Sequence, residues 1–187
     1  MSNTLAKYLG ALAFIAAFQF LTATLIAESM LPGYDNQMQV ISELGLGKTA
    51  GLFNSSIILA GALMMVAAFF TYKLYKKLYA GAAVFVCGAG IAGVGIFPMD
   101  TGFAHDLASN TAFFLGPLIA IGSFWFSRKP AAYLFVALGI ISIVSAMLFI
   151  SGIDLGFGIG LMERLIVYPF LIWAMAFGTY LIVSKEG

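Results

Sequence analysis

Long apolar runs alternate with short polar connections along the whole chain. The six runs are Tyr8–Ala27, Gly51–Tyr72, Tyr79–Phe97, Leu107–Phe126, Ala131–Ile150 and Leu161–Val183. Each is close to the roughly 20 residues that a helix needs to cross the hydrocarbon of a bilayer. Because backbone groups in lipid must bond within their own segment, and no barrel-type alternation occurs, the runs predict helices. The sequence therefore predicts an all-α polytopic membrane protein, with one six-helix transmembrane bundle over residues 1–187.

Composition excludes an ordinary soluble domain. The chain is 62% hydrophobic and only 9% charged, whereas about a quarter of the residues in a soluble domain are charged. The net charge of +1 predicts no nucleic-acid partner. Cys87 is the one cysteine and His105 the one histidine, which excludes an internal disulfide, a thiolate cluster, a multi-histidine zinc site and a bis-histidine haem. We therefore predict neither a cofactor nor a metal, although a hard-cation site at outer carboxylates remains an alternative.

The basic residues predict the orientation. Seven of them fall at the N-terminus, in the second and fourth connections or at the C-terminus, and they are Lys7, Lys73, Lys76, Lys77, Arg128, Lys129 and Lys185. Only Lys48 and Arg164 remain for the opposite side. Because basic loops stay in the cytoplasm, both termini are predicted to be cytoplasmic in the cell membrane. The first run is expected to be a retained helix rather than a cleaved signal.

The stretch from Phe97 to Asn110, which joins the third and fourth runs, gathers the candidate chemistry. It holds Asp100, His105, Asp106 and Asn110. A histidine beside a carboxylate can act as a general base near neutral pH. The alternative is structural, because acids near a helix N-terminus are stabilised by its dipole and an interfacial histidine commonly needs only a hydrogen bond.

Arg164 is the second candidate, because it opens the last apolar run beside Glu163. An ionisable side chain at membrane depth is costly and usually faces a partner. One interpretation is an ion pair that closes the bundle. The other is a guanidinium that clamps a phosphate or carboxylate head group. Ser42, near Glu43 in the long first outer connection, is a weaker candidate nucleophile, because the chain has no Gly-x-Ser-x-Gly elbow.

Several short motifs resemble one family over nearly the whole chain. They are Pro32-Gly33-Tyr34, Ile41-Ser42-Glu43-Leu44-Gly45, Asn54, Phe97-Pro98-Met99-Asp100, His105 and Glu163-Arg164. Together they resemble the bacterial and archaeal membrane family catalogued as domain of unknown function 998. That family is distantly similar to eukaryotic DRAM and Frag-like membrane proteins, some of them connected with lipid processing. The resemblance implies six membrane helices and no established activity. Where the family often has glutamine before the arginine, this chain has Glu163.

These observations predict an outward-facing polar pocket that binds or handles a membrane lipid or another amphipathic small molecule. The candidate catalytic residues are Glu43, Asp100 and His105, and the candidate ligand-binding residues are Tyr34, Asn54, Asn110 and Arg164. One alternative is a membrane-embedded hydrolase or acyl transferase that uses His105 and a carboxylate. A second is a structural membrane protein without a ligand.

Overall fold

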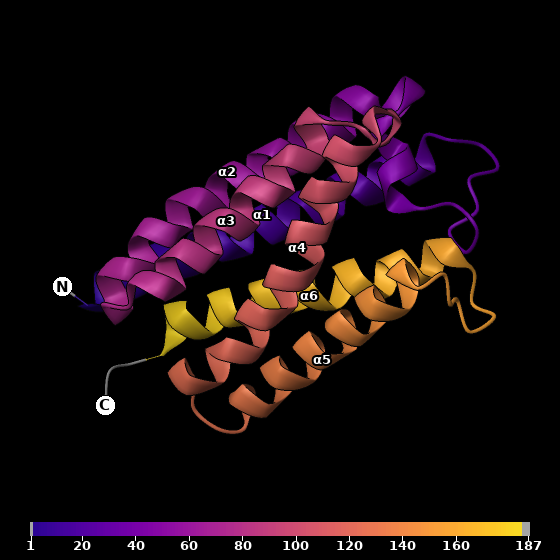
Figure 1. The fold of residues 1–187 in the computed structure, drawn as a ribbon. Coiled ribbons are helices and arrows are strands. Elements are labelled where there is room, and N and C mark those ends of the chain that lie inside the picture. The colour runs from indigo at the N-terminus through magenta and orange to yellow at the C-terminus, as the bar shows by residue number, and fades with distance from the viewer. Residues whose placement is uncertain (1, 185–187) are drawn as a thin grey trace.

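Six long helices follow the six apolar runs in the computed structural model, which describes residues 2–184 (Figure 1). Their bounds are α1 Ser2–Ser29, α2 Ala50–Tyr75, α3 Leu78–Ile96, α4 Phe103–Gly122, α5 Ala131–Ile150 and α6 Ile159–Val183. All six are long and apolar enough to cross a bilayer. The predicted all-α six-helix bundle is therefore confirmed, and the chain is a multi-pass membrane protein.

Some helices extend beyond the apolar runs that predicted them. Helix α4 begins at Phe103 and so includes His105 and Asn110 in its first two turns. An apolar run marks only the part of a helix in hydrocarbon, and the backbone bonds continue into the polar interface. Helix α3 ends at Ile96, just before Phe97-Pro98, because a proline disfavours the helical conformation in the residue that precedes it.

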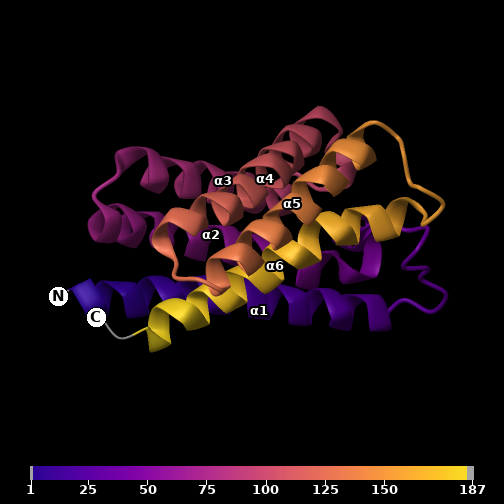
Figure 2. The same cartoon turned by 90° about the horizontal axis from the view of Figure 1, so that it is seen from below.

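The six helices form a closed ring. Each helix packs against the next one in sequence, and α6 returns to pack against α1. Figure 1 shows α4 crossing obliquely between the α2–α3 pair and the α5–α6 pair, and Figure 2 shows α6 beside α1. The ring is closed at α1 and α6 by glycines, since a Cβ added to Gly178 would lie 2.5 Å from the carbonyl oxygen of Gly10. Small residues allow such close approach of membrane helices.

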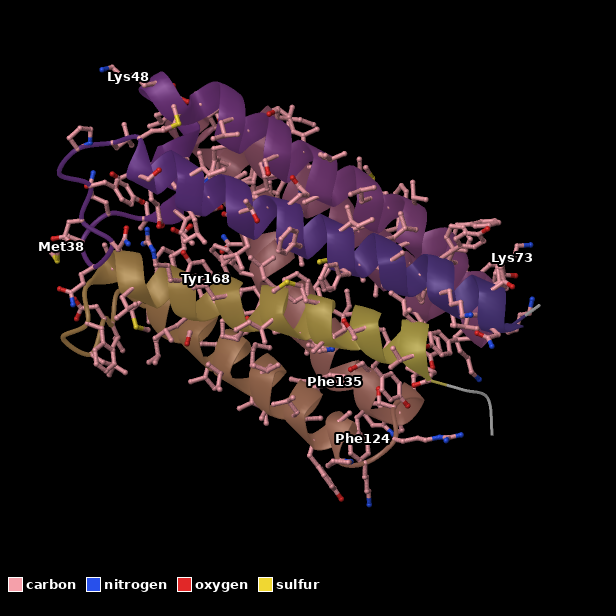
Figure 3. All side chains as sticks on the ribbon, turned by 180° about the vertical axis from the view of Figure 1, so that it is seen from behind. Met38, Lys48, Lys73, Phe124, Phe135 and Tyr168 are labelled. Atoms are coloured by element: carbon pink, nitrogen blue, oxygen red, sulfur yellow. The ribbon has the colours of Figure 1, made fainter. Side chains whose placement is uncertain are left out.

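The two ends of the bundle differ. Figure 3 shows Met38 and Lys48 at one end and Lys73 and Phe124 at the other. We call the first the loop end, because it carries the long connection of residues 30–49 with the 3₁₀ helices η1 (Ile41–Gly45) and η2 (Gly47–Thr49). The opposite end, where α1 begins and α6 ends, is the terminal end. A third 3₁₀ helix, η3 (Met99–Thr101), precedes α4, and a fourth, η4 (Ser123–Phe126), follows it.

Candidate functional site

The first turns of α6 hold the long connection against the bundle. Gly160 donates its backbone N–H to the Gln37 carbonyl at 2.8 Å. One terminal nitrogen of Arg164, Nη1, donates to the carbonyl oxygens of Asn36, Gln39 and Gly160, each at 2.9 Å. Gly160 has no room for a side chain, because an added Cβ would lie 2.8 Å from the Asn36 carbonyl oxygen. Arg164 therefore fixes the path of this connection through its main-chain carbonyls.

The other terminal nitrogen of Arg164, Nη2, forms a buried ion pair. It lies 2.7 Å from Oε1 of Glu28, and the two side chains are only 4% and 10% exposed. Nη2 also donates to the Tyr34 hydroxyl at 3.1 Å. Glu28 lies in the last turn of α1, so the pair joins the loop ends of α1 and α6. A charge-assisted pair of this kind needs both partners, because either charge alone would be buried without compensation.

Tyr34 completes this arrangement as a neutral donor. Its hydroxyl donates to the Val40 carbonyl at 2.8 Å while it accepts from Arg164. Burial raises the pKa of Tyr34 to about 12, and the adjacent guanidinium only partly opposes the shift. The hydroxyl therefore keeps its proton at physiological pH and can donate it to the Val40 carbonyl.

Glu163 is buried and points toward η1. Its carboxylate accepts a hydrogen bond from the backbone N–H of Ile41, and Oε1 accepts another from the Ser42 hydroxyl at 2.9 Å. Glu163 and Arg164 are consecutive, so their side chains leave α6 about 100° apart. The arginine thus holds the outer part of the connection, and the glutamate holds the 3₁₀ helix beneath it.

Two further predicted residues bond to the long connection, one from α2 and one from within η1. Asn54, in the second turn of α2, donates from Nδ2 to the Gly45 carbonyl at 3.0 Å. Its Oδ1 is buried and has no hydrogen-bond partner among the described residues. Glu43 is half-buried and accepts from Nε2 of Gln39 at 3.0 Å. Both side chains therefore bind to the connection itself.

His105 links the ends of two helices. Its Nδ1 lies 2.8 Å from the carbonyl oxygen of Phe97, the residue that follows α3. A carbonyl can only accept, so Nδ1 carries the proton and donates. Ser109, one turn further along α4, donates its hydroxyl to the Asp106 carbonyl at 3.2 Å. The histidine contact satisfies the carbonyl that follows the C-terminus of α3, and no hydroxyl nucleophile among the described residues bonds to the histidine.

The remaining two candidates lie near His105. Asp100 is exposed on η3, Asn110 is half-buried on α4, and neither side chain forms a hydrogen bond within the described residues. Contacts between η3 and η1 bring this connection beside the first one.

The structure thus brings together part of the predicted set. Tyr34 contacts Arg164 directly, and Gln39 links both to Glu43 through its carbonyl and its side chain. The predicted roles of these residues in ligand binding or catalysis stay predictions. For Arg164, the contacts favour the ion-pair interpretation, because Nη1 and Nη2 already bind protein groups.

Sequence reasoning missed several partners in this cluster. The partners of Arg164 that it missed are Glu28, Asn36 and Gln39. It also missed that Ser42 bonds to Glu163. One signal could have identified Glu28: it is an acid just beyond the first apolar run, on the same predicted side as Arg164, which needs a partner. The contacts to backbone carbonyls had no signal, since every residue has a carbonyl.

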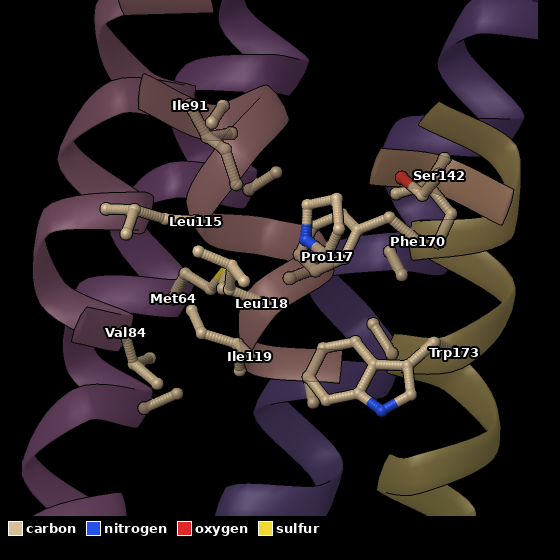
Figure 4. A pocket seen from close by; sticks show the side chains of 18 of the residues that line it. Met64, Val84, Ile91, Leu115, Pro117, Leu118, Ile119, Ser142, Phe170 and Trp173 are labelled. Carbon is tan, nitrogen blue, oxygen red and sulfur yellow. The ribbon is translucent and has the colours of Figure 1, made fainter. Parts of the chain in front are cut away.

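A cavity of about 690 Å³ lies inside the ring, between this polar cluster and the terminal end. Figure 4 shows some of the side chains that line it. Its wall is mainly aliphatic and aromatic and includes side chains from all six helices. It extends from Ile41 and Ser42 of η1 at the loop end to Tyr75 and Phe126 at the terminal end. In Figure 4, Pro117, Phe170 and Trp173 face its central part.

The cavity reaches the surface between α3 and α4. The two helices are in contact in their loop-end halves, where an added Cβ at Gly93 would lie 2.9 Å from Ala108. Nearer the terminal end, α4 packs on α5 instead, and an added Cβ at Gly139 would lie 2.8 Å from the Pro117 carbonyl oxygen. Tyr79 and Leu118 line the cavity and are 69% and 50% exposed. The opening therefore faces the membrane rather than the loop end.

Comparisons with known proteins identify only a family. The search of curated proteins and the search of solved structures each found no match to this chain. One family model matches residues 14–180, which includes the polar cluster and almost the whole helical ring. The chain therefore belongs to the family described as a protein of unknown function (DUF998).

Proposed function

We propose that this membrane protein binds a lipid or another amphipathic small molecule, with the apolar part of the ligand in the central cavity. The observation that carries the proposal is the cavity itself. Its volume of about 690 Å³ falls in the range of roughly 300–1,000 Å³ that is typical of small-molecule sites. An apolar wall and a membrane-facing opening suit a ligand that arrives from the lipid phase.

Fluorescence of Trp173 tests whether a lipid chain occupies the cavity. The chain has two tryptophans, and a Trp125→Phe variant keeps only Trp173, which lines the cavity and is 4% exposed. In bilayers of phospholipid with brominated chains, we expect strong quenching of Trp173. Adding Ala83→Phe, which fills part of the cavity, should reduce that quenching by roughly half, because a packed space cannot hold both groups.

Ala82→Phe is the matched control for this experiment. Ala82 precedes Ala83 on α3, but it is exposed and does not line the cavity. Its variant should leave the quenching of Trp173 unchanged. Equal quenching in the Ala83→Phe and Ala82→Phe proteins would contradict the proposal, since it would come from lipid outside the ring.

The proposed orientation places the terminal end in the cytoplasm, because that end carries most of the basic residues. Cysteines introduced at Lys76 and Lys129 should then resist an impermeant thiol reagent in intact cells. A cysteine at Asp35, at the loop end, should be labelled. The native Cys87 is buried and should not interfere. Labelling at the first two positions and protection at the third would reverse the orientation.

With this orientation, the opening between α3 and α4 faces the cytoplasmic half of the membrane. The ligand would therefore enter from the cytoplasmic leaflet, although the sequence alone had pointed to the outer one. Tyr79 and Trp125 border the opening, and both are largely exposed. Aromatic side chains of this kind are common at the membrane interface, so the opening lies at the level where an amphipathic ligand enters from the lipid.

A further inference from the structure

Glu163 is the one charged side chain on the wall of the central cavity. It is 3% exposed and lies at the loop end, next to Ile41 and Ser42. The rest of the wall is hydrocarbon, aromatic rings and a few hydroxyls. An ionisable residue facing the interior of a membrane bundle is costly, so it commonly marks a binding site.

No basic side chain among the described residues pairs with Glu163. The neighbouring Arg164 pairs with Glu28 instead. The two groups that bond to the Glu163 carboxylate, the Ile41 N–H and the Ser42 hydroxyl, are neutral. A buried carboxylate needs a compensating charge or a proton, and the described part of the chain does not supply the charge.

The serine and threonine hydroxyls on the same wall already have acceptors. Those of Thr71, Ser109 and Ser142 each donate to a backbone carbonyl, and Ser142 reaches the Ile166 carbonyl at 2.5 Å. The two oxygens of a carboxylate offer about four acceptor positions, and the hydrogen bonds to Glu163 come from Ile41 and Ser42 alone. Glu163 is therefore the free acceptor at the loop end of the cavity, whereas the unpaired hydroxyl of Tyr75 lies at the terminal end.

Aromatic rings line the cavity along the way to Glu163. Phe20 and Phe53 meet edge to face with centroids 5.5 Å apart, and both border the loop-end half. Phe170 and Trp173 stack on the α6 side at 5.4 Å. The faces of such rings attract cations. A cationic group thus meets rings with favourable electrostatics and then a carboxylate without a counter-charge.

We infer that Glu163 binds the positively charged group of a lipophilic cation, such as an amphipathic amine, at the loop end of the cavity. The inference rests on the proposed function, because it uses the same cavity. It adds the chemical class of the ligand: a cation with a large apolar part, rather than an anionic or neutral lipid.

Two ions of equal shape and opposite charge test the inference. The purified full chain in detergent is titrated with tetraphenylphosphonium and, separately, with tetraphenylborate, and binding is measured by calorimetry. The measured quantity is the ratio of the two affinities. We expect this ratio to fall at least about tenfold from wild type to Glu163→Gln, and comparing variants cancels the partitioning of each ion into micelles.

Matched variants keep the test independent of folding. Glutamine can accept from Ile41 and bond to Ser42, so Glu163→Gln should fold, as a thermal melt would verify. Ser42→Ala removes a hydroxyl partner but keeps the charge, and it should retain the preference for the cation. If both ions bind and the ratio is unchanged by Glu163→Gln, the inference is overturned and the proposed function survives. If neither ion binds to the wild type, both are overturned.

Discussion

Replacing Arg164 by methionine should lower the free energy of unfolding by about 3–5 kcal/mol. The guanidinium is 4% exposed, and its loss leaves the Glu28 carboxylate without a cationic partner, with only the Tyr168 hydroxyl 3.5 Å away. The carbonyls of Asn36 and Gln39 lose a donor as well. Reversible unfolding in mixed micelles, followed by tryptophan fluorescence, would measure the change.

Two further variants separate the causes of this loss. Arg128→Met removes an exposed arginine and should change stability by no more than about 0.5 kcal/mol. The double variant Glu28→Gln, Arg164→Met removes both charges, so it should be more stable than Arg164→Met alone. A double variant that is no more stable would show that the ion pair is not the cause.

The same experiment bears on the ligand-clamp hypothesis for Arg164. A clamp predicts that Arg164→Lys folds as well as the wild type and loses its bound ligand. The observed contacts predict the reverse, because one ammonium cannot replace a planar fork that bonds to Glu28, Tyr34 and three carbonyls. We therefore expect Arg164→Lys to lose stability, with unchanged ligand content per folded molecule.

The helices were predictable from sequence because each segment that crosses a bilayer must be apolar over about 20 residues. The run Ala131–Ile150 coincides with α5, and Gly51–Tyr72 falls within α2. Their connections were less predictable. The 3₁₀ helix η1 is supported by Glu163, 122 residues from Ile41, and by Asn54 of the next helix, which both bond to its backbone. No pattern within η1 encodes that support.

The cavity could not be predicted for a different reason. Ala82 and Ala83 are identical in type and adjacent in sequence, yet one faces outward and the other lines the cavity. In a membrane, an apolar side chain is equally suitable against lipid and against another helix. Hydropathy therefore cannot distinguish the two faces, and the space inside the ring depends on where α4 leaves α3.

Glu163 and Arg164 are consecutive in sequence but have different surroundings in the helical ring. The charge of the neighbouring Arg164 is balanced by Glu28, so the polar cluster needs no charge from Glu163. The sequence placed Glu163 and Arg164 together as one candidate pair. The structure separates them by direction: the arginine belongs to the contacts that close the loop end, and the glutamate to the wall of the cavity.

The contact between α2 and α3 gives the second large effect. These helices meet at Gly61 and Gly88, where a Cβ added to Gly61 would lie 2.5 Å from the Gly88 carbonyl oxygen. Backbone atoms cannot move aside as a flexible side chain can. Gly61→Ala must therefore push the helices apart, and we expect it to lower the free energy of unfolding by about 1–3 kcal/mol.

Gly51→Ala is the control, and it should have the opposite sign. Gly51 lies in the first turn of the same helix, and an added Cβ there meets no atom within 4 Å. Alanine has less backbone freedom to lose on folding than glycine, which favours the variant by roughly 0.5–1 kcal/mol. The same propensity gain applies at Gly61, so the difference between the two variants isolates the cost of separating α2 from α3. Equal changes in stability at the two positions would mean that the helices do not meet at Gly61 and Gly88.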